Sequence, residues 1–244
     1  MDKLHLDKHI SRQFNEELES LRQQVMAMGG LAEEMISDAT RAVVEGDTEL
    51  AQKVVESDDR VNEMEKTIDE RCIMVLARRQ PTASDLRLVV AMIKAINDLE
   101  RIGDEAEKIA RMAIRLAEAD RPRTNYRELE IMGTTVRGML HDALDGFARL
   151  APEVAVELVR KDKNVDADYE AALRQYHTYL VEDSRNTRRI IDAIWVARSM
   201  ERIGDHAKNI GEYIVYLVEG KDLRHATLAE MERELGDGGS SRSG

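Results

Sequence analysis

Apolar residues recur along the first part of the chain at alternating steps of four and three positions. This spacing keeps one stripe of a helix apolar and is typical of long helices in left-handed bundles. The pattern predicts one such helix, which ends where Gly46 and Asp47 interrupt it. Its apolar positions are Phe14, Leu18, Leu21, Val25, Met28, Ala32, Met35, Ala39 and Ala42.

Two more helices are predicted in the first half of the chain. One runs from about Thr48 to Arg78 and ends before the Gln-Pro-Thr segment at 80–82. The side chain of Thr82 or Ser84 is expected to cap the other helix. That third helix carries the same kind of apolar seam, at Met92, Ala95, Leu99, Ile102, Ala106, Ile109, Ala113 and Leu116.

The second half of the chain repeats the first. The stretch from Met28 to Ala39 aligns with the stretch from Met132 to Ala143, and the sequence Glu-Arg-Ile-Gly-Asp at 100–104 recurs unchanged at 201–205. The seam recurs as well, at Ala193, Val196, Met200, Ile203, Ala207, Ile210, Ile214 and Leu217. A shared pentapeptide inside a shared seam indicates an internal duplication. The predicted fold is all-α, with two tandem three-helix bundles of antiparallel, coiled-coil-like helices related by a pseudo-two-fold axis.

The repeat divides the chain into four segments. We expect a first bundle over 1–119, a linker around Pro122 over 120–124 and a second bundle over 125–222. The remaining segment, 223–244, is a tail whose Gly- and Ser-rich end from Gly236 is expected to be disordered.

Composition and charge narrow the class of protein. The formal charge of −12 argues against a nucleic-acid partner and against direct binding to anionic membranes, so a membrane is expected only through partner proteins. Cys72 is the single cysteine, so no intrachain disulfide forms, and no apolar run reaches the ~20 residues that a spanning helix needs. The N-terminus lacks an apolar secretory core. These features predict a cytoplasmic protein.

Paired acidic residues are the most distinctive chemistry in the chain. Glu100 and Asp104 are four positions apart and therefore project from one face of their helix, off its apolar seam. Glu201 and Asp205 repeat the pair in the second half. The glycine inside each copy, at 103 and 204, is costly in a helix, which suggests that a backbone or a ligand approaches closely there.

The second helix of each unit adds further acids. Asp58 and Asn62 lie four apart in the first unit, and Asp162 and Asp166 occupy the corresponding positions in the second. If the second and third helices of a unit are antiparallel neighbours, these side chains converge with the paired acids. Oxygen ligands suit hard cations such as Mg, Ca, Mn or ferric iron. The alternative is that the acids are solvated or bridged by arginines such as Arg101 and Arg202.

Catalytic machinery is not evident in the sequence. No Gly-rich phosphate loop, nucleophile arrangement or Glu-x-x-His di-iron signature is present. Cys72 lies among apolar residues and is expected to be a core thiol. Trp195 lies one step from the seam and is expected to be a packing residue, with an interface anchor as the alternative.

These motifs resemble the PhoU family. The resemblance rests on residues 98–104 with Ala106 and Ile109, on residues 200–205 with Ala207, Asn209 and Ile210, and on the early stretch 14–42. It covers about residues 5 to 220. It implies two symmetric three-helix bundles that hold metal clusters, with iron or zinc in some relatives and Mg or Mn in others. Carried over by position, the ligands are Glu100, Asp104, Glu201 and Asp205, with Asp162, Asp166 and Asp58 as further candidates. Asn62 stands where a carboxylate would be the stronger ligand, which predicts a first site that is weaker or holds fewer ions.

The resemblance also implies a function. Family members repress the phosphate-starvation response when phosphate is plentiful and link the ATPase subunit of the phosphate-specific ABC transporter to a phosphate-responsive sensor histidine kinase. They are not known as enzymes and are often homodimers. The alternatives left open are a metal-dependent enzyme and a metal-storage bundle that uses the acidic clusters.

Overall fold

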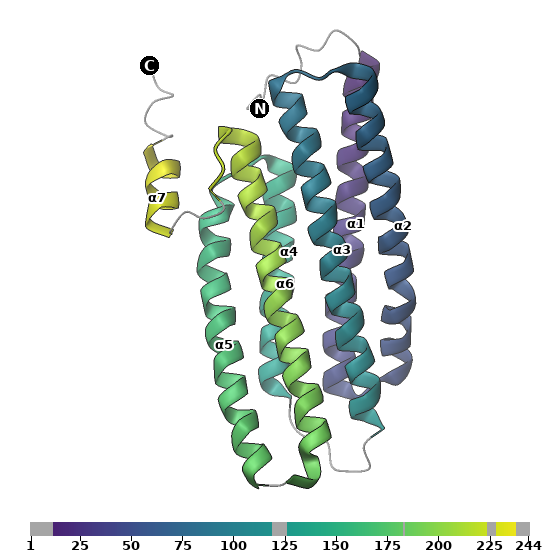
Figure 1. The fold of residues 1–244 in the computed structure, drawn as a ribbon, viewed down its shortest axis with the longest axis vertical. Coiled ribbons are helices and arrows are strands. Elements are labelled where there is room, and N and C mark those ends of the chain that lie inside the picture. Colours follow the sequence, from purple (N-terminus) through teal and green to yellow (C-terminus); the bar gives the residue numbers. More distant parts are fainter. Residues whose placement is uncertain (1–11, 119–125, 183, 224–227, 238–244) are drawn as a thin grey trace.

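The computed structural model describes residues 12–118, 126–182, 184–223 and 228–237. In these ranges there is no strand, and the fold consists of helices that run mostly along one long axis (Figure 1). The all-α prediction is confirmed. The elements are α1 (Arg12–Glu45), α2 (Thr48–Arg79), α3 (Ala83–Ala117), α4 (Arg127–Arg149), α5 (Val154–Glu182), the short 3-10 helix η2 (Ser184–Asn186), α6 (Thr187–Glu219) and α7 (Leu228–Asp237).

The helices form two units of three. Helices α1, α2 and α3 pack on one another, and α4, α5 and α6 do the same beside them (Figure 1). The units meet where α3 lies along α6 and α1 lies along α4. All residues of the three predicted seams are buried, which confirms the heptad pattern as the source of both cores. The predicted linker, 120–124, lies outside the described residues.

Helix ends follow the turn residues closely. Helix α1 ends at Glu45, before Gly46, and the carboxylate of Asp47 accepts the N–H of Leu50 at 2.9 Å to cap α2. At the start of α3, Thr82 occupies the capping position, but its hydroxyl bonds the Asp85 carboxylate at 3.2 Å instead of a backbone N–H. The prediction of a side-chain cap there is therefore wrong.

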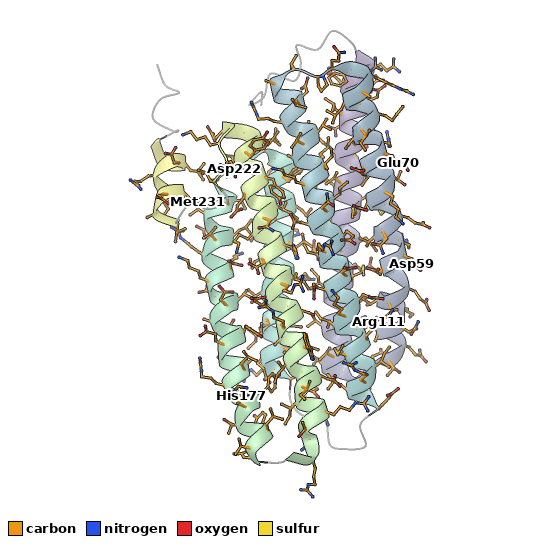
Figure 2. The ribbon with its side chains drawn as sticks, in the orientation of Figure 1. Asp59, Glu70, Arg111, His177, Asp222 and Met231 are labelled. Atoms are coloured by element: carbon orange, nitrogen blue, oxygen red, sulfur yellow. The ribbon has the colours of Figure 1, made fainter. Side chains whose placement is uncertain are left out.

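Helix α7 was not anticipated from the sequence. It packs on α5 through the buried Met231, which Figure 2 labels, and through an ion pair between Arg160 and Glu232 at 2.5 Å. Gly236 and Asp237 belong to this helix and not to a disordered tail, whereas residues 238–244 lie outside the described ranges.

Two glycines bring α1 and α4 into close contact. A Cβ atom added at Gly133 would lie 2.3 Å from the Oγ1 atom and 3.0 Å from the Cβ atom of Thr40. A Cβ atom added at Gly29 would lie 2.4 Å from the Cδ2 atom of Leu144. Gly29 and Gly133 are equivalent positions in the repeat, as are Thr40 and Leu144, so the two contacts are related by the pseudo-two-fold axis.

Polar groups join α3 to α6. The Oδ1 atom of the buried Asp98 lies 2.7 Å from the Nδ1 atom of His206 and accepts from the amide of Asn209 at 3.2 Å. The Oδ2 atom of Asp98 accepts from the hydroxyl of Tyr213 at 2.7 Å. His206 thus turns away from the neighbouring Asp205 and toward the first unit. The Asp98 carboxylate therefore contacts three side chains of the other bundle.

Gln80 is expected to be a site of relievable strain. Its φ of 45° places an exposed, non-glycine residue in the left-handed region at the end of α2. We expect Gln80→Gly to raise the free energy of unfolding by about 0.5–1 kcal/mol, since the strain removed exceeds the added freedom of the unfolded chain. Urea denaturation measures the change. Glu70→Gly, at an exposed position inside α2, should instead lower stability by about 1 kcal/mol, and equal effects at both positions would contradict the assignment of strain.

Candidate metal centre

Each unit gathers acidic side chains between its second and third helices. We call the set Asp58, Asn62, Glu65, Glu100, Asp104 and Glu107 the α2–α3 cluster. We call the set Asp162, Asp166, Glu201, Asp205 and Lys208 the α5–α6 cluster. The i, i+4 spacing places the acids of each helix on one face, and the antiparallel packing of neighbouring helices brings the two faces together. The predicted convergence is therefore observed in both units.

Asp58 is the most enclosed acid of the α2–α3 cluster. Its side chain lies at the contact with α3, and its Oδ2 atom accepts from the amide of Asn62 at 2.9 Å. Its Oδ1 atom is buried and has no hydrogen-bond partner. A Cβ atom at Gly103 would lie 3.3 Å from that oxygen and 3.2 Å from Val61, so the glycine lets α2 approach α3 at this point. Gly103 is therefore closely approached, although by side chains and not by a backbone. The expected close approach at Gly204 is wrong, since a Cβ atom there would make only ordinary contacts.

Negative charge accumulates in the α2–α3 cluster. Burial, followed by repulsion from Glu107 and Asp104, raises the pKa of Asp58 above its usual range. Burial, followed by repulsion from Asp104, likewise raises the pKa of Glu100. Both shifts mean that the ionised cluster is unfavourable as it stands and would be stabilised by an added cation.

Arginines pair with some of these acids only at the rim. Arg101, whose side chain is largely exposed, lies 3.5 Å from Glu100 and 3.7 Å from Asp104, and Arg111 donates to Glu107 at 3.0 Å. Arg202, in contrast, reaches across to Glu105 of the first unit at 3.2 Å. The alternative that arginines bridge the acids is therefore met only by long contacts at Arg101. It is not met by Arg202, which pairs with an acid outside its own cluster.

The α5–α6 cluster contains its own cation. The Nζ atom of Lys208 donates to Asp162 at 2.5 Å and to Asp205 at 2.9 Å. Burial alone would lower the pKa of Lys208, but these two hydrogen bonds outweigh burial and raise it. Glu201 is bound by Arg198 at 2.6 Å through Oε1, while its Oε2 atom is buried without a hydrogen-bond partner.

The donor sets of the two clusters suit a metal ion unequally. In the α2–α3 cluster the donors are all oxygens and one buried carboxylate oxygen lacks a partner, which fits a hard cation. In the α5–α6 cluster two of the four acids already share an ammonium group. Within the described part of the chain, no three His, Cys, Asp or Glu side chains are gathered closely enough to hold an ion as placed. A bound cation would therefore require side-chain rotation.

Sequence reasoning missed Glu107 and Lys208. The alignment that matches the two Glu-Arg-Ile-Gly-Asp segments also matches position 107 with position 208. The opposite charges at these two positions were therefore available as a signal, but only the structure shows that both side chains face the clusters. Of the predicted ligands, Asp166 is exposed and the others are buried or half-buried.

Replacing Asp58 with asparagine is expected to raise the melting temperature at neutral pH by about 2–4 °C, roughly 1 kcal/mol for a chain of this size. Because the pKa of Asp58 is raised in the folded state, the native protein binds the proton more tightly than the unfolded chain. Stability then falls as the pH rises from the unfolded-state pKa of Asp58 to its higher folded-state pKa, and the loss is complete above the folded-state pKa.

The measurement is a series of melting curves from acid to neutral pH in the presence of a chelator. The curves of the wild type and of Asp58→Asn should separate as the pH rises. Asp59→Asn, at the exposed neighbouring position, is the control and should follow the wild type. Parallel curves for Asp58→Asn and the wild type would contradict the prediction.

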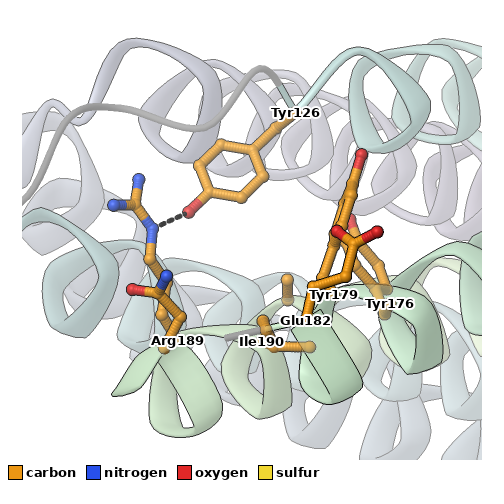
Figure 3. A pocket seen from close by; sticks show the side chains of 8 residues that line it. Tyr126, Tyr176, Tyr179, Glu182, Arg189 and Ile190 are labelled. Carbon is orange, nitrogen blue, oxygen red and sulfur yellow. Dashed lines mark hydrogen bonds between the residues drawn. The ribbon is translucent and has the colours of Figure 1, made fainter. Parts of the chain in front are cut away.

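A pocket lies at one end of the second unit. Its volume is about 230 Å³, and it is lined by Tyr126, which precedes α4, by Tyr176 and Tyr179 of α5, and by Glu182 and Arg189 (Figure 3). The Tyr126 hydroxyl accepts from Arg189 at 2.7 Å, and the Tyr176 hydroxyl donates to Glu128 at 2.8 Å. Burial raises the pKa of Tyr176, so its hydroxyl stays protonated. These contacts support a structural role for the pocket walls.

The expectations for two further residues, Cys72 and Trp195, have opposite outcomes in the structure. Cys72 is fully buried and burial raises its pKa to about 12, so the expectation of an inert core thiol is confirmed. Trp195 is 57% exposed, so the expectation that it packs in the core is wrong. It lies on α6 one turn after Ile191, itself 43% exposed.

The fold and the clusters define a class of protein: a duplicated all-helical bundle with an acid cluster between the second and third helices of each repeat. In the described residues no helix is long and apolar enough to cross a membrane. Residues 25–113 and 129–214 match the family model described as the PhoU domain. The chain belongs to the PhoU family.

Relatives with similar sequences match this chain over nearly its full length. A phosphate-specific transport system accessory protein PhoU from Escherichia coli is 50% identical over 96% of this chain and 97% of its own length. A homologue from Pseudomonas putida is 50% identical over 96% of this chain and 92% of its own length.

Solved structures agree with the fold. The crystal structure of PhoU from Pseudomonas aeruginosa superposes with a TM-score of 0.83 at 50% identity, over 85% of this chain and 100% of that chain. The crystal structure of the phosphate transport system regulatory protein PhoU from Streptococcus pneumoniae superposes with a TM-score of 0.78 at 30% identity, over 86% of this chain and 98% of that chain.

Proposed function

We propose that this protein is a negative regulator of the phosphate-starvation response that couples the phosphate-specific ABC transporter to a sensor histidine kinase. The observation that carries the proposal is the half-identical match, over nearly the whole chain, to proteins named as accessory proteins of the phosphate-specific transport system. The protein acts as an adaptor and not as an enzyme. Relatives are named accessory or regulatory proteins, and the buried, protonated Cys72 is no nucleophile.

An exposed apolar surface supports an adaptor role. Trp195 and Ile191 lie one turn apart on α6 and present large apolar side chains to solvent. Tryptophan is one of the side chains enriched among those that dominate the binding energy of protein interfaces. The proposal assigns this surface to docking on the ATPase subunit of the transporter or on the kinase, which shifts the kinase toward its repressing state.

Co-purification in phosphate-rich and phosphate-poor medium, together with a reporter of the starvation response, tests the proposal. The wild-type chain should associate with transporter and kinase and repress the reporter in rich medium. Trp195→Ala should weaken association at least tenfold, a loss of ~1.4 kcal/mol, and derepress the reporter. Val181→Ala, at a position 88% exposed on α5, is the matched control. Absence of association in both media would overturn the proposal.

The same proposal includes a cation at the acidic clusters. Of the expected metals, which were Fe, Mn, Mg and Zn, the all-oxygen donor set favours the hard cations Mn, Mg and ferric iron over Zn. A bound cation would neutralise the charge between α2 and α3 and hold the two helices together. The residues that would hold it are Asp58, Glu100 and Asp104.

A further inference from the structure

Within the two acid clusters, the repeats carry opposite charges at one equivalent position. Position 107 on α3 carries glutamate, and the matching position 208 on α6 carries lysine. Both side chains interact with the aspartate on the preceding helix of their own unit, Asp58 or Asp162. The repeats therefore present the same acidic framework with opposite charges added to it.

In the α5–α6 cluster the added charge is a positive one between two acids. The ammonium group of Lys208 lies 2.5 Å from Asp162 on α5 and 2.9 Å from Asp205 on α6. Asp162 and Asp205 are the counterparts of Asp58 and Asp104. The second repeat thus shows that this framework accommodates a cation at this place, between the aspartates of the two helices.

In the α2–α3 cluster the added charge is negative. Glu107 repels Asp58 in place of neutralising it, and its own arginine partner is Arg111, at 3.0 Å. The buried Oδ1 atom of Asp58 has no hydrogen-bond partner, and the Asp58 side chain is more than nine-tenths buried. The cation found in the second repeat is missing from the first, and an unpartnered oxygen is left at the corresponding aspartate.

We propose that the α2–α3 cluster binds a single hard divalent cation, while Lys208 serves as a built-in cation that closes the α5–α6 cluster to metal. The proposal rests on the cation-binding part of the proposed function. It reverses the expectation drawn from Asn62, which predicted the weaker site in the first unit. Asn62 still offers an amide oxygen once its side chain turns, whereas Lys208 would have to leave before a metal ion entered the second cluster.

Electrostatics explains why the closure is effective. A divalent ion between Asp162 and Asp205 would stand next to the ammonium group and be repelled by it, in a half-buried place where repulsion is poorly screened. Arg198 already holds Glu201 at 2.6 Å, which removes a further donor. The buried Oε2 atom of Glu201 is unpartnered, as the Oδ1 atom of Asp58 is in the first cluster. The difference between the clusters therefore lies in the cationic side chains, Lys208 and Arg198, that already neutralise the second.

Binding of Mn²⁺ to the full-length, chelator-treated protein tests the proposal, with calorimetry for affinity and electron paramagnetic resonance for stoichiometry. The wild type should bind one Mn²⁺ per chain, in competition with Mg²⁺. Glu107→Lys, which copies position 208 into the first repeat, should weaken binding at least thirtyfold. Lys208→Glu, which copies position 107 into the second, should add a second Mn²⁺ site per chain.

Two milder variants guard against loss of the fold, which circular dichroism monitors throughout. Asp58→Asn should weaken Mn²⁺ binding at least tenfold, whereas Asp162→Asn should leave it within twofold of the wild type. Loss of binding in Asp162→Asn with retention in Asp58→Asn would overturn the proposal, as would two sites in the wild type or no Mn²⁺ binding at all. The reporter and co-purification assays test the regulator role separately. Failure of the cation proposal therefore does not imply failure of the regulator proposal, and the reverse also holds.

Discussion

Replacing Gly133 with valine is expected to lower the free energy of unfolding by about 3 kcal/mol. A side chain at this position would collide with Thr40 on α1, including its Cβ atom, which cannot rotate away. The hydroxyl of Thr40 is also held by the carbonyl of Ile36 at 2.8 Å. Helices α1 and α4 would therefore have to move apart, and the contact between the two bundles would loosen. Urea denaturation followed by circular dichroism measures the change.

Gly138 provides the matched control for this prediction. It lies on the same helix, and nothing lies within 4 Å of a Cβ atom added there. Gly138→Val should leave stability unchanged or raise it by about 0.5 kcal/mol, since valine is a better helix former than glycine. Gly29→Ala should cost less than Gly133→Ala, because its clash is with the flexible end of Leu144. If Gly133→Val and Gly138→Val were equally stable, the packing argument would fail.

Replacing Asp98 with alanine is expected to destabilise the protein by about 3–5 kcal/mol. The carboxylate is buried and accepts from Asn209 and Tyr213 and contacts His206, all on α6. Its removal takes the shared acceptor away from half-buried polar groups on α6, and each hydrogen bond lost carries a desolvation cost. Thermal and urea unfolding both report the loss.

Two comparisons isolate the role of this carboxylate. Tyr213→Phe removes one of its hydrogen bonds and should cost about 1–2 kcal/mol. Asp59→Ala, at an exposed aspartate on α2 that Figure 2 labels, should change stability by less than about 0.5 kcal/mol. A loss in Asp98→Ala no larger than that in Asp59→Ala would show that the network joining α3 to α6 carries no stability.

The helices could be predicted from the sequence because their signals are local. The apolar seams determine which face of each helix is buried, and Gly46, Asp47 and Pro81 determine where the first helices end. Helix α7 escaped prediction because it is short and its single buried anchor, Met231, makes no seam. Trp195 was misplaced because a helical seam does not show how far neighbouring helices cover α6. Packing buries Ala193 and Val196 on either side of it and leaves Trp195 exposed.

The candidate site was predicted in part. Spacing on a helix shows which acids share a face, so the convergence of Asp58 with Glu100 and Asp104 could be expected. Spacing does not show which charged neighbour turns toward them. Lys208 could equally have pointed to solvent, and only packing shows that it lies between Asp162 and Asp205. The partner of His206 likewise depends on how the two bundles dock, which no local pattern encodes.

The reciprocal glycine contacts make the interface between the bundles resemble that of a symmetric dimer. Gly29 meets Leu144, and Gly133 meets Thr40, the counterpart of Leu144, as in an isologous association of two identical half-length chains. In such a dimer every substitution appears twice, so both acid clusters would have to carry the same residue. Fusion of the halves into one polypeptide removes that constraint. It is what allows position 107 to remain glutamate while position 208 is lysine, so that two sites of common origin can diverge within one molecule.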